Sequence, residues 1–144
     1  MSSPLTRLIA RLLLVPILLF GIGILIKGYS QTGGGFSGGL IAALGVMLQY
    51  AVFGHETVEQ RLPFTARSAV GLAGFGLALM LMVTFLPVLA DIAPLTHVPL
   101  AEAEVIHIGA FELHTALAFE SGIFLVVFGF VVAALHVIAE GDSP

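Results

Sequence analysis

The sequence has no cysteine and little charge, and each absence removes a class of protein. Without cysteine, the 144-residue chain has no disulfides, zinc–thiolate sites, iron–sulfur clusters or catalytic thiol. Charged residues make up only 10% of the chain, against roughly 25% in an ordinary soluble domain. Because the chain contains only five Lys and Arg residues, it offers no basic surface, and nucleic acid is excluded as a partner.

The residues that remain are mostly apolar, at 58% of the sequence, and the mean hydropathy is +1.11. A soluble fold needs charged side chains outside as well as apolar ones inside, so this composition indicates an integral membrane protein. Four apolar runs, each near the length that crosses roughly 30 Å of hydrocarbon at about 1.5 Å per residue, predict transmembrane helices. We therefore expect an all-α membrane protein, a single domain over 1–144, with helices at about 8–26, 36–53, 69–90 and 115–139.

Polar segments separate these runs. Residues 54–67 are predicted to form a polar loop, and residues 91–114 an extramembrane loop on the outer side. Within the second loop, the strand-like composition of 105–108 and 111–113 predicts a short hairpin. These assignments leave no room for a separate soluble module.

The distribution of Lys and Arg predicts the orientation. Arg7 and Arg11 precede or begin the first span, Arg61 and Arg67 lie in the second loop, and only Lys27 lies in the first loop. Positive charge in short loops favours the cytoplasmic side. Both termini are therefore expected in the cytoplasm.

A glycine block, residues 33–39, opens the second span. It matches the pattern G-x-G-x-x-G, but a membrane helix precedes it instead of a strand, which excludes a dinucleotide fingerprint. Small residues recur every four positions in two sets, and on a helix each set forms a ridge that lets another backbone approach closely. We expect these residues to form a helix-packing and assembly surface: Gly33, Gly34, Gly35, Phe36, Gly38, Gly39, Ala42 and Ala43.

Two further readings accompany that surface. Free N–H groups at the start of the second helix can hold an anion or a carboxylate, which is the alternative to packing. A weaker small-residue pattern occurs at Gly74 and Ala78 in the third span and at Gly129 and Ala133 in the fourth. These four positions are also expected to pack against helices.

Glu120 is the acidic residue inside the fourth span. Acids within membrane segments are costly and often mark ion or proton pathways, so Glu120 is the candidate for an ion path. The equally open alternative is that it satisfies one structural partner near the outer interface. His136, near the other end of the same span, is expected to be interfacial.

The remaining histidines, His97, His107 and His114, lie in the outer loop beside acidic residues. No ligand spacing of the H-x-x-x-H kind occurs on a predicted helix. We predict no metal site, no cofactor and no catalytic residues.

Three segments carry a family resemblance: Gly28 with Gly33-Gly34-Gly35-Phe36-Ser37-Gly38-Gly39-Leu40, then Glu112-Leu113-His114-Thr115-Ala116, then Phe119-Glu120-Ser121-Gly122-Ile123-Phe124-Leu125-Val126-Val127. With the length and the four-span layout, they resemble the B-subunit family of Mrp-type (Mnh-type) multisubunit sodium/proton antiporters. The chain departs from that pattern in two places. Members commonly have His-Asn-x-Pro where this chain has Tyr29-Ser30-Gln31-Thr32, and aspartate where it has Glu120.

The resemblance implies a small subunit of a cation/proton antiporter complex in the cytoplasmic membrane, a secondary transporter component and not an enzyme. Its implied partners are the other membrane subunits and the lipid bilayer, with Na⁺ and H⁺ as the ions the complex transports. Its implied contributions are assembly interfaces and part of an ion path at Glu120. The alternative is a purely structural subunit of a related membrane-bound hydrogenase or complex-I-like assembly.

Overall fold

Four long helices make up most of the computed structural model, which describes residues 3–28, 33–61, 66–91, 93–95, 107–108, 111–112 and 115–141. These are α1 (Pro4–Gly28), α2 (Gly34–Phe53), α4 (Ala66–Phe85, continued by the 3₁₀ helix η1, Leu86–Ala90) and α5 (Thr115–Gly141). Each is long and apolar enough to cross a membrane. The predicted all-α membrane fold with four spans is confirmed, and each observed helix begins a few residues earlier than predicted or at the predicted residue.

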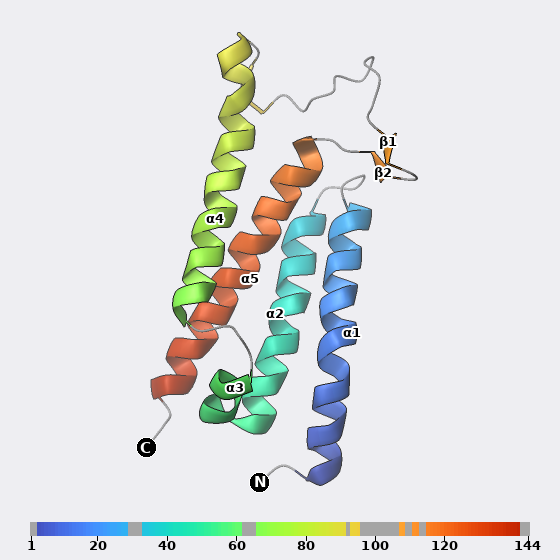
Figure 1. The fold of residues 1–144 in the computed structure, drawn as a ribbon, viewed down its shortest axis with the longest axis vertical. Coiled ribbons are helices and arrows are strands. Elements are labelled where there is room, and N and C mark those ends of the chain that lie inside the picture. The colour runs from blue at the N-terminus through green and yellow to red at the C-terminus, as the bar shows by residue number, and fades with distance from the viewer. Residues whose placement is uncertain are drawn as a thin grey trace.

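The helices form a row and not a closed bundle (Figure 1). Their order across the row is α1, α2, α5, α4, because α2 packs against α1 and α5, and α4 packs against α5. Within the described residues, no contact joins the two outer helices α1 and α4. As a result, α2 is the most buried span, while most side chains of α1 and α4 face outward.

A short helix, α3 (His55–Arg61), lies where the sequence predicted a polar loop over 54–67. Gly54, with φ of +78°, ends α2 in a backbone conformation that favours glycine, and its N–H donates to the Tyr50 carbonyl. Val58 then packs into the core at 3% exposure. The loop prediction was wrong for 55–61 because this one buried apolar side chain is too weak a pattern to reveal a helix.

The segment after α4 lies at the opposite end of the helix axes from α3. Asp91 ends η1 in the left-handed region at φ of 56°, and the N–H of Leu95 donates back to the carbonyl of Thr84. The predicted hairpin is present as β1 (His107–Ile108) paired antiparallel with β2 (Phe111–Glu112). Apart from residues 93–95, the rest of the predicted 91–114 loop lies outside the described residues.

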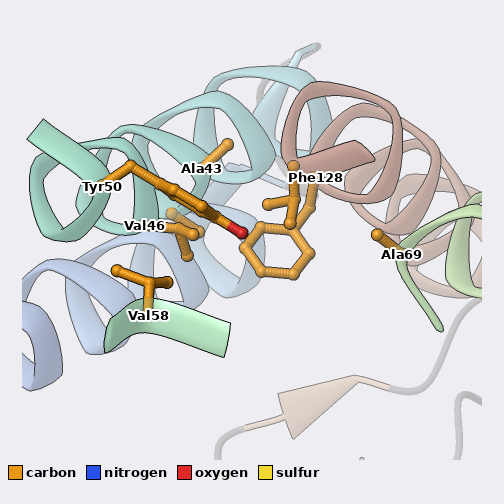
Figure 2. Packing of buried hydrophobic residues seen from close by; sticks show 8 residues of the cluster. Ala43, Val46, Tyr50, Val58, Ala69 and Phe128 are labelled. Atoms are coloured by element: carbon orange, nitrogen blue, oxygen red, sulfur yellow. The ribbon is translucent and has the colours of Figure 1, made fainter. Parts of the chain in front are cut away.

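The core lies where α2, α3, α4 and α5 converge (Figure 2). Val46 and Val132 are 1% exposed, and Figure 2 shows the rings of Tyr50 and Phe128 beside Val46. The buried cluster consists of Ala42, Ala43, Val46, Tyr50, Val58, Ala69, Phe128 and Val132. Along the helix axes, the start of α1, the end of α5 and α3 all lie at one end of the molecule. The glycine block that begins α2 lies towards the other end (Figure 1).

Candidate functional site

One small-residue ridge of α2 faces α1. Gly34, Gly38 and Ala42 are all buried, and a Cβ added to Gly38 would collide with the carbonyl oxygen of Gly21. In return, a Cβ added to Gly21 would lie 2.7 Å from the Gly38 carbonyl oxygen and 3.2 Å from the Ala42 Cβ. The two backbones are thus close enough that neither glycine has room for a side chain.

The other ridge of α2 faces α5. Gly35, Gly39 and Ala43 are buried, with Ala43 at 0% exposure, and a Cβ on Gly39 would lie 2.7 Å from the carbonyl oxygen of Phe124. Both predicted ridges therefore contact helices of this same chain. Two members of the predicted surface lie elsewhere: Phe36 is 56% exposed, and Gly33 caps α2 at φ of +103°.

The weaker small-residue patterns of α4 and α5 differ in whether they contact a helix of this chain. Gly129 packs on α4, where an added Cβ would lie 2.5 Å from the Ala69 carbonyl oxygen. Gly74 has no neighbour within 4 Å of an added Cβ, and Ala78 is exposed. Gly74 and Ala78 thus lie away from the contact with α5, to which α4 turns the face bearing Gly76, and their packing against another helix stays a prediction.

The side chain of Glu120 on α5 contacts the first residues of α2. Its Oε2 accepts a 2.5 Å hydrogen bond from the N–H of Gly35, and its Oε1 lies 3.5 Å from the N of Gly33. The first N–H groups of a helix have no partner within the helix, so this carboxylate caps α2 from a neighbouring helix. Packing and carboxylate binding, which the sequence presents as alternatives, occur together here.

A polar cluster lies at the opposite end of the helix axes from Glu120. His136 on α5 is 6% exposed, so its ring is buried among the helices near the end of the span, and its predicted place at the membrane interface stays a prediction. Its Nδ1 lies 3.1 Å from the hydroxyl of Tyr50, and its Nε2 lies 3.3 Å from Oε1 of Glu59 on α3. The other oxygen of Glu59 lies 3.4 Å from Nε2 of His55.

This three-residue cluster of His55, Glu59 and His136 was missed from the sequence. Its ligand atoms all lie within 4.8 Å of one another, close enough to hold a metal ion. The available signal was the i, i+4 spacing of His55 and Glu59, which brings two side chains to one face only if the segment is helical. In a loop, which the sequence predicts over 54–67, the same spacing does not bring the two side chains together.

Comparison with known families finds a match, described as "Domain related to MnhB subunit of Na+/H+ antiporter", over residues 5–133. The B subunit of the Na(+)/H(+) antiporter of Alkalihalophilus pseudofirmus is 31% identical over 141 residues, which is 98% of this chain and 95% of the relative. The protein of the same name from Bacillus subtilis is 31% identical over 126 residues, 88% of this chain and 85% of the relative. The similarity to these relatives therefore runs along most of both chains.

A solved structure has the same fold. It is titled "Structure of Mrp complex from Dietzia sp. DQ12-45-1b" and matches all of this chain with a TM-score of 0.73 at 24% sequence identity. The match covers 16% of the solved chain, so there the four-helix row is a small part of a much longer polypeptide.

Proposed function

Because the chain belongs to the family of domains related to the MnhB subunit of Na⁺/H⁺ antiporters, we propose that it is a membrane subunit of a multisubunit Na⁺/H⁺ antiporter complex. The observation that carries the proposal is the match of the family over 5–133, which includes nearly all of α1, all of α2 and α4 and most of α5. The subunit would act as a transporter component and not as an enzyme, in the cytoplasmic membrane.

The open row of helices supports a role in assembly. α1 packs mainly on α2, and α4 packs mainly on α5, so both outer helices expose large apolar side chains on the rest of their surface. Leu12 and Phe20 on α1 are 66% and 63% exposed, and Phe75 and Met82 on α4 are each 62% exposed. These outer faces, and not the α2 ridges, are the surfaces we assign to partner subunits and lipid.

Two roles for Glu120 follow from its position. As a structural group it anchors the start of α2 to α5, which keeps the two middle helices in register. As part of an ion path it would exchange a proton or cation, a role favoured by its being only partly buried. The complex would use the second role only if Glu120 is required for transport in complexes that assemble normally.

The orientation belongs to the same proposal. The start of α1 and the end of α5 lie at one end of the row together with α3 (Figure 1). Arg7, Arg11, Arg61 and Arg67 also belong to that end by their positions in α1, α3 and the start of α4. We assign this end to the cytoplasm, because short positively charged segments are retained there.

The test is genetic and biochemical. In a host lacking this chain, everted membrane vesicles should lose Na⁺-dependent proton efflux, and the wild-type chain should restore it. The Glu120→Gln chain should then be compared per assembled complex, using a native gel to quantify assembly. Antiport that persists without this chain contradicts the subunit role, and full antiport by assembled Glu120→Gln complexes contradicts the ion-path role alone.

A further inference from the structure

We propose that His55, Glu59 and His136 form a binding site for a divalent transition-metal ion of the Zn²⁺ class, which fastens α3 to α5. The site would have two imidazoles and one carboxylate, a set that zinc uses when a fourth position is left for water. The site lies at the far end of the helix axes from Glu120, and the proposal does not depend on the antiporter role.

The distances fit an ion better than direct hydrogen bonds. The two nitrogen–oxygen separations at Glu59 are 3.4 Å to His55 and 3.3 Å to His136. A direct N–H···O bond is usually ~2.7–3.2 Å long. Two ligands of a tetrahedral Zn²⁺ with bonds of ~2.0–2.1 Å lie about 3.3–3.4 Å apart. Each imidazole thus lies at the spacing of a Zn²⁺ ligand from the carboxylate oxygen it faces, Oε2 for His55 and Oε1 for His136, and the ligand atoms of the three residues all lie within 4.8 Å of one another.

A hydrogen bond from the ring nitrogen that does not face Glu59 fixes the orientation of His136. Tyr50 on α2 contacts Nδ1 of this ring at 3.1 Å, and both side chains are buried. If Nδ1 carries the proton and donates to the tyrosine oxygen, the lone pair of Nε2 points to Glu59. Metal-binding histidines are commonly held in this way by an outer hydrogen bond, which selects the ring tautomer.

His55 has little else to bind. Its Nδ1 is buried and has no hydrogen-bond partner among the described residues, so Glu59 is the polar group its ring faces. Its ring centroid is 4.8 Å from that of His136 at an interplanar angle of 63°. Two imidazole rings that converge on one carboxylate from two different helices supply the nitrogen and oxygen donors of a metal ligand set.

The site has an entrance. The side chain of Glu59 is 40% exposed, against 14% for His55 and 8% for His136. An ion from the aqueous phase would reach the carboxylate first and the two imidazoles behind it. Since α3 joins two membrane helices and His136 belongs to a third, a bound ion would hold the connection between α2 and α4 against α5.

The experiment uses the full chain purified in detergent with a tag that contains no histidine. The other three histidines, His97, His107 and His114, are replaced by glutamine in every protein, so that only the proposed pair remains. Zn²⁺ affinity is measured by competition with a chromogenic chelator, and Co²⁺ is added separately to record its visible spectrum. Circular dichroism checks that each variant is folded.

We expect one Zn²⁺ per chain and an intense tetrahedral Co²⁺ spectrum. His55→Gln and Glu59→Gln should each weaken Zn²⁺ binding about 100-fold, and Tyr50→Phe about 10-fold, as for loss of an outer hydrogen bond. Glu56→Gln is the matched control, because Glu56 lies on α3 outside the cluster, and its affinity should stay unchanged. Zn²⁺ should also raise the melting temperature of the control and not that of Glu59→Gln.

Three results would overturn the site. They are the absence of stoichiometric Zn²⁺ binding, binding that Glu59→Gln and His55→Gln leave intact, and a weak octahedral Co²⁺ spectrum. The last is read on the protein with all three ligands present, so it applies even if a substituted chain does not fold. Because no measurement here depends on transport, loss of the antiporter assignment would leave the result standing.

Discussion

The carboxylate of Glu120 on α5 accepts a 2.5 Å hydrogen bond from the backbone N–H of Gly35 on α2. The same glycine has no room for a side chain, because an added Cβ would collide with the backbone carbonyl of Glu120. The absence of a side chain at Gly35 thus brings the donor and the carboxylate together. This contact joins the two middle helices of the row at the end where α2 begins.

Glu120→Ala should destabilise the chain. It leaves the N–H of Gly35 unpaired and partly buried, at a cost in free energy of unfolding of about 1–3 kcal/mol. Glu120→Gln should cost less, because its amide oxygen can still accept the bond. Thermal unfolding in detergent, followed by circular dichroism, measures both, and Glu140→Gln is the control because Glu140 is exposed near the end of α5. Equal melting temperatures for Glu120→Ala and the control would contradict the cap.

Gly76→Ala should destabilise the seam between α4 and α5. The added Cβ would lie 2.6 Å from the Gly122 carbonyl oxygen and 2.8 Å from the Leu125 Cβ, so the helices must move apart. Gly74→Ala is the matched control on the same helix, since its Cβ meets nothing within 4 Å. The control should be neutral or gain roughly 0.5–1 kcal/mol from helix propensity. The two melting temperatures should therefore shift in different directions or by different amounts, and equal losses would argue against the seam.

Gly38→Leu should prevent assembly of the complex by first disrupting the chain itself. Gly38 packs against Gly21 on α1, so a bulky side chain there separates the α1–α2 pair. The isolated chain should lose its monodisperse profile in detergent, and the complex should disappear from native gels. For the isolated chain, Gly23→Leu is the control that should keep the monodisperse profile, because Gly23 lies on α1 with open space around it. A well-folded isolated Gly38→Leu chain that fails only to join its partners would show that α2 contacts another subunit.

The orientation can be measured with single cysteines, since the natural sequence has none. Glu56→Cys on α3 should resist a membrane-impermeant maleimide in intact cells and react in everted vesicles. Glu104→Cys, in the predicted outer loop, should show the opposite pattern. Labelling of Glu56→Cys from outside intact cells would reverse the proposed topology.

Much of the fold was predictable because membrane spans are long and their composition is distinctive. The two ridges of α2 were readable as well, since small residues four apart lie on one helix face whatever they meet. The sequence did not reveal that one ridge meets α1 and the other α5, because that depends on the order of helices across the row. Periodicity along one helix says nothing about which neighbour lies beside it.

The polar cluster was hidden for a different reason. The place of His136 near the end of a span indicates an interfacial residue, and its partners Tyr50 and Glu59 are distant in sequence. α3 has only seven residues, which are too few for a periodic apolar pattern to indicate a helix. Only the packing of α3 under α2 and α5 brings His55 and Glu59 to His136, and that packing is a tertiary property.

The order of helices across the row also determines when each helix can pack during synthesis. α1 and α2 are consecutive and contact each other, so they can pair as soon as both have left the ribosome and entered the membrane. α4 is made before α5, yet among the described helices α5 is its only long neighbour. Until the last helix inserts between α2 and α4, the third span must remain in lipid without a partner from its own chain. We therefore expect the nascent protein to pass through a stage with a formed α1–α2 hairpin beside a solitary α4, which α5 then joins.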